Sequence, residues 1–158
     1  MRRRLRHRRV DVPPGQSPAV AGMWSVKLDP FVQVDDTLFS VSRNALVRRK
    51  GPPLRRSVND VALEVFDYGG VVYRFQVSGR LEEVTTRAPV VHIGEIAIPF
   101  RALAAFVKAQ DPDVFERASF LVSPRFGLAF VPADPDWVTA LARHCLPTWH
   151  ALGSTGQA

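Results

Sequence analysis

The chain has very little cysteine and no long apolar run, and each scarcity removes a class of protein. Cys145 is the single cysteine among 158 residues. One thiol forms neither an intrachain disulfide nor a site of several thiolates, which excludes a disulfide scaffold and a zinc ribbon and indicates a reducing compartment. The longest apolar stretches, such as 102–107, are far shorter than the ~20 residues that span a bilayer. We therefore expect a cytoplasmic protein without a membrane partner.

The usual fingerprints of cofactor binding and catalysis are also missing. The sequence has no GxGxxG, GxxxxGK[ST] or GxSxG motif, and its four histidines show no HxH, HxxxH or HExxH spacing. These motifs mark nucleotide-binding loops, hydrolase nucleophiles and metal sites. We therefore expect no cofactor, no metal and no catalytic residues.

Positive charge is present and unevenly distributed. The 21 Lys and Arg exceed the 15 Asp and Glu by six, and residues 1–22 supply five of these charges through six arginines and one acid. This segment lacks the apolar stretch of an export signal. Two interpretations remain open: a disordered basic arm that touches phosphates, or a true start of translation at Met23.

A second basic segment lies inside the folded part. Residues 43–56 carry six cations and no acid, whereas the rest of 23–158 carries nine basic and 14 acidic residues. Polarised charge of this kind orients a protein on an anionic partner. The alternative is a solvated loop.

The periodicity of the apolar residues predicts an α+β fold, with a mainly antiparallel sheet and two or three short helices. Apolar and polar residues alternate on both sides of Gly69-Gly70, which predicts a hairpin, because both glycines can take positive φ. We expect a single domain over 23–150 and a flexible tail over 151–158. Helices are expected at 44–50, at 100–109 and from Asp134 to about Cys145. Strands are expected at 24–34, 37–42, 61–66, 71–78, 81–86, 90–98, 118–122 and 126–131.

Two Asp-Pro-Asp triplets, at 111–113 and 134–136, could supply carboxylates to a divalent cation. Helix N-caps are the favoured interpretation, because Asp accepts from free amides and Pro fits the first turn; Asp134 is the better case. Cys145 is expected in the core and His92 as a surface or hydrogen-bonded histidine. His144 and Cys145 are adjacent, so in a helix they diverge by roughly 100° and do not form a nucleophile–base pair.

Three stretches carry a further pattern: FSVSRNAL at 39–46, ALEVFDYGGVVYRF at 62–75 and GEIAIPFRALAAFVK at 94–108. Together, within roughly 37–132, they resemble a single domain of the bacterial DNA polymerase sliding clamp, the processivity factor. The resemblance implies helices whose cations face the DNA backbone. A clamp subunit has three such domains, so several copies of this chain would be needed to close a ring. The expected helix at 135–145 has no counterpart in one clamp domain.

These observations predict a non-catalytic, DNA-associated binding or assembly module, clamp-like in form, that contacts phosphate without reading sequence. The expected phosphate contacts are Arg48, Arg49, Lys50, Arg55 and Arg56, with Arg101 and Lys108 as secondary contacts. One alternative is a protein–protein adaptor, binding itself or another protein, in which 43–56 is a flexible loop. The other is a small enzyme whose Asp or His side chains meet only in the fold.

Overall fold

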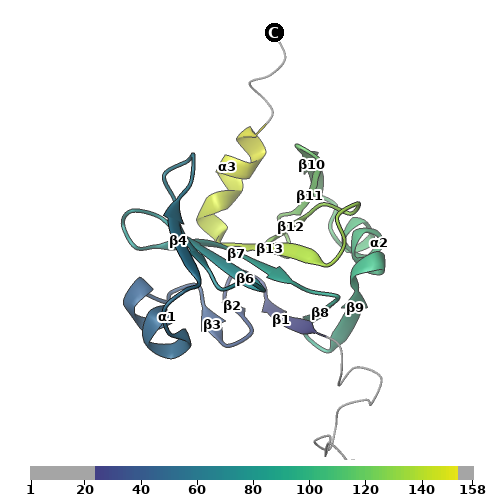
Figure 1. Cartoon of the computed structure of the whole chain (residues 1–158). Coiled ribbons are helices and arrows are strands. Elements are labelled where there is room, and N and C mark those ends of the chain that lie inside the picture. Colours follow the sequence, from purple (N-terminus) through teal and green to yellow (C-terminus); the bar gives the residue numbers. More distant parts are fainter. Residues whose placement is uncertain (1–23, 153–158) are drawn as a thin grey trace, which may run out of the picture.

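The computed structural model describes residues 24–152, which form two β-sheets around a shared core (Figure 1). The large sheet is antiparallel throughout and consists, in spatial order, of β10 (Phe115–Arg117), β11 (Phe120–Ser123), β12 (Leu128–Phe130), β13 (Trp137–Leu141), β7 (Leu81–Arg87), β6 (Val71–Phe75), β5 (Glu64–Asp67) and β4 (Arg55–Val58). The small sheet consists of β3 (Thr37–Leu38), β2 (Gln33–Val34), β1 (Ser25–Asp29), β8 (Val90–Ile93) and β9 (Ile96–Pro99).

In the small sheet β1 and β8 are parallel and the other pairs are antiparallel. The helices are α1 (Arg43–Lys50), α2 (Phe100–Gln110) and α3 (Leu146–Ala151), the last preceded by a 3-10 turn at Arg143–Cys145. Two mainly antiparallel sheets with three short helices confirm the predicted α+β class. The expectations for residues 1–22 and 153–158 lie outside the described residues.

The two sheets are joined where β7 runs almost directly into β8. Ala88 and Pro89 separate the two strands, and proline cannot donate to a β ladder. Ala88 is fully buried, and its amide donates instead to the carbonyl of Asp136 at 2.6 Å. The chain therefore leaves the large sheet at this point without an unsatisfied donor.

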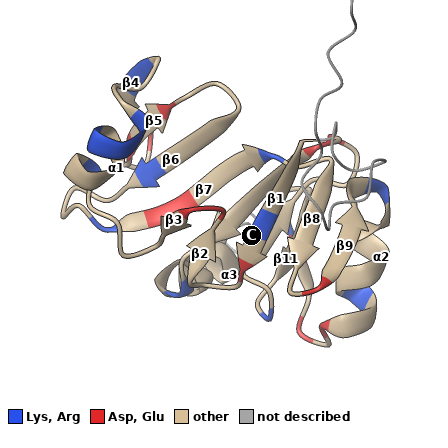
Figure 2. Cartoon of the chain, turned by 90° about the horizontal axis from the view of Figure 1, so that it is seen from below, with Lys and Arg blue, Asp and Glu red and all other residues tan. Residues whose placement is uncertain are grey.

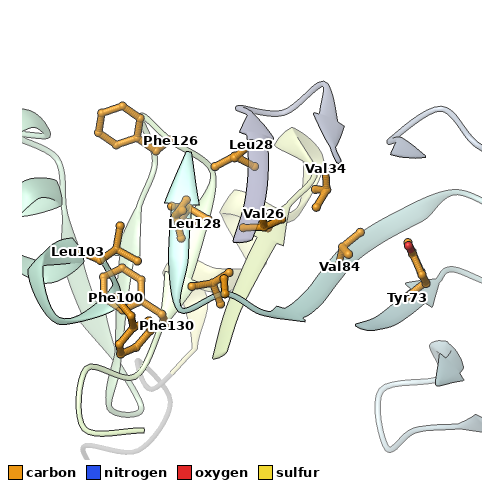
Figure 3. Close-up of a cluster of buried hydrophobic side chains, with 14 of the residues drawn as sticks. Val26, Leu28, Val34, Tyr73, Val84, Phe100, Leu103, Phe126, Leu128 and Phe130 are labelled. Carbon is orange, nitrogen blue, oxygen red and sulfur yellow. The ribbon is translucent and has the colours of Figure 1, made fainter. Parts of the chain in front are cut away.

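The two faces of the large sheet pack differently. Its core face covers the small sheet, α1 and α2, and Figure 3 shows side chains from β1, β6, β7, α2 and β12 meeting there, among them Val26, Tyr73, Val84, Phe100 and Phe130. The opposite face, called the α3 face, carries a smaller cluster of Val122, Ala129 and Leu141 beneath α3. Within residues 24–152, α3 is the helix that lies over this face (Figure 1).

The strongest local predictions are confirmed. β5 and β6 form the predicted hairpin, with Tyr68 N–H donating to the Val71 carbonyl at 2.9 Å across Gly69-Gly70. Only Gly69 of this pair has a positive φ, 90°, which is the pattern of a type II′ turn. The helix expected at 100–109 is α2, which buries Phe100, Leu103 and Val107.

The helix predicted from Asp134 to Cys145 is wrong. Residues 137–141 form β13, which lies between β12 and β7 in the middle of the large sheet. Four of its five residues are buried, and they lie on both parities of the strand, so the run cannot be distinguished from a buried helix by periodicity. Asp134 is therefore no N-cap; its amide donates to the Val131 carbonyl in a turn.

Two smaller expectations also need correction. The strand expected at 37–42 ends at Leu38, because Ser42 is the N-cap of α1 and its hydroxyl accepts from the Ala45 amide at 3.1 Å. Residues 55–58, part of the loop in the adaptor alternative, form strand β4 at the edge of the large sheet.

Candidate functional site

The basic end of the molecule, defined as α1 together with β4, holds five of the predicted phosphate contacts. α1 is fixed by its Ser42 cap and by Leu46, which is fully buried. Its last turn carries Arg48, Arg49 and Lys50, all exposed, and the helix ends at Gly51. Cations in this place also complement the negative end of the helix dipole, so part of their role is structural.

Three of the five cations already have partners within the chain. Arg49 donates from Nη2 to the Thr37 hydroxyl at 3.1 Å, and Lys50 Nζ lies 3.8 Å from Asp36 Oδ1. Arg56 pairs with Glu64, whose second oxygen takes Arg43 of α1, each at 3.1 Å. Glu64 of β5 thus connects the large sheet to α1 through Arg43, and it pairs with the neighbouring strand β4 through Arg56.

Arg55 and Arg56 point to opposite faces of the large sheet, because successive strand residues alternate. Arg56 lies opposite Phe66 on the core face, with its guanidinium 4.5 Å from that ring centroid. Arg55 lies opposite Asp67 on the α3 face. Among residues 24–152, neither Arg48 nor Arg55 makes a hydrogen bond or ion pair, so both guanidinium groups face solvent without a partner.

The two secondary contacts lie elsewhere. Arg101 and Lys108 are exposed on α2, and α1 and α2 occupy opposite ends of the molecule in both Figure 1 and Figure 2. The structure therefore places Arg48, Arg49, Lys50, Arg55 and Arg56 at the same end of the molecule, with Arg55 and Arg56 on opposite faces of the sheet, and it places Arg101 and Lys108 at the other end. The sliding-clamp resemblance stays a prediction.

The Asp-Pro-Asp triplet at 111–113 serves a structural purpose different from the predicted N-cap. Asp111 follows the last turn of α2 and is buried. Its carboxylate accepts from the Ser123 hydroxyl at 2.6 Å, the Arg125 amide at 3.0 Å and the Asp113 amide at 2.9 Å. Burial acts to raise the pKa of Asp111, but these hydrogen bonds outweigh it and the pKa is lowered. Asp111 thereby ties α2 to the β11–β12 turn.

The Cys145 thiol and the His144 imidazole are not hydrogen-bonded to each other within the described part of the chain. Cys145 is buried, as predicted, and its thiol donates to the Glu82 carbonyl at 2.9 Å. Burial, followed by the charges of Glu82 and Glu83, raises its pKa to about 12. Burial, and then the charge of Arg80, lowers the pKa of His144.

His92 lines a groove of about 520 Å³ with Asp29 and Asp35. Asp35 is already engaged there, since its Oδ1 accepts from the Lys27 amide at 2.8 Å. Within the described part of the chain, no three His, Cys, Asp or Glu side chains are placed to hold a metal ion.

Sequence reasoning missed a polar groove on the α3 face. The groove has a volume of about 490 Å³ and lies between β6, β7 and β13 on one side and β11 and α3 on the other. Arg74, Thr85 and Thr139 form part of its lining, together with Phe120 and Trp149. The parity of β6 was the available signal, since Arg74 alternates with the buried Tyr73 and Phe75.

Comparison with family models, with curated proteins and with solved structures gives no match to this chain. None of the helices in residues 24–152 is long and apolar enough to cross a membrane.

Proposed function

We propose that this protein is a non-catalytic binding module that holds the phosphate backbone of DNA at its basic end. The observation that carries the proposal is that Arg48 and Arg55, exposed and without partners in the described chain, lie at the end where 43–56 supply six cations and no acid. Contact with phosphate needs position and charge only, so such binding is independent of sequence.

The local charge balance supports an anionic partner. The acids that contact or face the six cations are Asp36, Glu64 and Asp67, which leaves an excess of three positive charges. The end of the α1 dipole subtracts about half a charge. The basic end thus keeps a positive field, although the chain from 23 to 158 is nearly neutral.

The test compares two double variants of the full chain that change charge equally in different places. Arg48→Gln/Arg55→Gln removes the free cations of the basic end, and Arg101→Gln/Lys108→Gln removes two exposed cations of α2. Fluorescence anisotropy with a labelled duplex is measured over a salt series. Each lost phosphate contact reduces the magnitude of the slope of log K against log salt concentration by about 0.9. The magnitude of this slope should therefore fall by about 1.8 for Arg48→Gln/Arg55→Gln and should not change for Arg101→Gln/Lys108→Gln.

The six arginines of residues 1–22 are common to all these proteins, and any binding they contribute cancels in the comparison. Equal slopes for the two double variants would refute the proposal, because binding would then depend on overall charge or on the arm. The outcome does not depend on whether the module forms a clamp-like ring.

A protein–protein adaptor is the second candidate, favoured by apolar side chains exposed at the same end. Leu54 is 81% exposed and Val58 66% exposed, on and beside the edge strand β4. Open edge strands pair with other strands, and a charge placed on them prevents this. If β4 mediates self-association, Val58→Lys should abolish it in sedimentation velocity over a concentration series, whereas Ile96→Lys on β9 should not. An unchanged sedimentation profile would remove this candidate.

A further inference from the structure

The groove on the α3 face has a floor of connected polar side chains. Arg74 donates from Nη1 to the Thr85 hydroxyl at 2.7 Å, and Thr85 and Thr139 share a hydrogen bond at 2.9 Å. One guanidinium N–H is used in this way, and no other hydrogen bond of the Arg74 side chain occurs within residues 24–152. The floor therefore offers a fork of free donors beside hydroxyls that both donate and accept.

An unpaired carboxyl group lies next to this fork. Glu83 of β7 is directly opposite Arg74 of β6 in the sheet register. The two nevertheless form no ion pair, since the ion pairs of residues 24–152 involve other side chains. Burial, partly offset by the charge of Arg74, raises the pKa of Glu83. The Arg74 guanidinium and the Glu83 carboxyl group thus lie on neighbouring strands and are both available to hydrogen-bond a ligand.

Aromatic rings from separate elements form the walls. Trp149 of α3 packs edge-on against Phe120 of β11, with ring centroids 5.2 Å apart. Trp137 of β13 also lines the groove, and Arg87 lies 5.4 Å from the centroid of its ring. Each indole provides a flat apolar surface that contact with a ligand can cover.

The charge of the groove excludes a polyanion as the preferred ligand. Arg74 is the single cation among its lining residues, against the carboxyl groups of Glu83 and Asp134. A phosphate chain would meet like charge here, whereas a neutral ligand would not. The volume of about 490 Å³ lies within the range of small-molecule sites, ~300–1,000 Å³.

We propose that this groove binds a neutral carbohydrate. A sugar hydroxyl donates and accepts at once, which matches a floor made of a guanidinium, a carboxyl group and two hydroxyls. The apolar C–H face of a pyranose ring covers an indole, as the Trp137 and Trp149 walls allow. This site is separate from the basic end and does not rest on DNA binding.

The test is a titration of the full chain with cellohexaose, maltohexaose, mannohexaose and chitohexaose, followed by calorimetry and by intrinsic fluorescence. Two of the three tryptophans line the groove, and Trp24→Phe removes the third from the signal. At least one neutral sugar should bind saturably and change the tryptophan emission. Thr139→Val, which keeps a β-branched side chain, and Arg74→Gln should each weaken that binding about tenfold.

Arg48→Gln/Arg55→Gln is the matched control and should leave sugar binding unchanged, while Thr139→Val should leave the salt slope for duplex DNA unchanged. DNA binding at the basic end and carbohydrate binding in the groove are therefore tested independently of each other. Absence of saturable binding by every one of these sugars overturns the proposal, as does equal affinity of wild type and Thr139→Val. If an oligothymidylate changes the tryptophan emission saturably and none of the sugars does, the groove binds single-stranded nucleic acid instead and the proposal is wrong.

Discussion

The Asp111→Asn variant is expected to lower the free energy of unfolding by about 2 kcal/mol. Asp111 is 1% exposed, and its two carboxylate oxygens accept three hydrogen bonds within the chain. Its position between α2 and the β11–β12 turn makes it a connection between distant parts of the fold.

The size of this expected loss in unfolding free energy follows from the hydrogen bonds that each carboxylate oxygen of Asp111 accepts. Oδ2 accepts from the Ser123 hydroxyl and the Arg125 amide, and Oδ1 accepts from the Asp113 amide. An asparagine oxygen in the place of Oδ2 keeps the first two bonds. Its amide nitrogen then faces the Asp113 N–H, so one bond to a charged group is lost and a donor is left unsatisfied, at a cost of about 1.5–3 kcal/mol.

The variant also has a predictable pH dependence. The native pKa of Asp111 is lowered: burial opposes this, but the hydrogen bonds from Ser123, Arg125 and Asp113 outweigh it. A lowered native pKa stabilises the fold above the unfolded value of ~3.9 and ceases to do so as the pH falls through the native value. The difference between wild type and Asp111→Asn should therefore be largest near neutral pH and narrow below about pH 4.

The measurement is urea unfolding followed by far-UV circular dichroism, at neutral pH and at about pH 3. Asp113→Asn is the matched control, because Asp113 belongs to the same triplet but is exposed and contributes only its backbone amide. It should change the free energy of unfolding by less than about 0.5 kcal/mol. Equal effects of the two substitutions, or a difference that does not narrow in acid, would refute the reasoning.

Three further predictions concern other parts of the fold. Glu64→Gln should lower the free energy of unfolding by about 1 kcal/mol, because its carboxylate connects two arginines, whereas the exposed Glu95→Gln should have no measurable effect in the same urea titration. Gly127→Ala should cost about 1–3 kcal/mol, since Gly127 has a φ of 58° and an added Cβ would lie 2.9 Å from the Phe31 ring; an unchanged urea midpoint would contradict this. Cys145, whose pKa burial raises to about 12, should react with an aromatic disulfide reagent at neutral pH only after unfolding; stoichiometric labelling of the native protein would show that the thiol is accessible.

Local sequence determined the elements whose signals are contained in a few neighbouring residues. Gly69-Gly70 between two alternating runs specifies the β5–β6 hairpin, because the turn needs a residue with positive φ. Ser42 before a basic octapeptide and the apolar stripe of α2 likewise specify their helices. The α+β class follows from the same short-range patterns. Cys145 is buried as predicted, but the helical stripe that predicted this is a strand followed by a 3-10 turn.

Tertiary packing decided the elements that local patterns leave ambiguous. Residues 137–141 are a strand because they fill the gap between β7 and β12 and pair with both strands. Asp111 is a buried acceptor because the β11–β12 turn, 12 residues further on at Ser123, brings its donors to it. The apolar and polar pattern along the sequence does not show which of these segments meet.

The same division applies to the candidate sites. Composition alone identified the basic segment 43–56, since charge density is a local property. Only the sheet register separated Arg55 from Arg56 onto opposite faces, gave Glu64 two arginine partners and placed α2 at the far end. The groove was also beyond the sequence, because its lining comes from strands 54 residues apart, such as Thr85 and Thr139, which meet only when β7 and β13 pair.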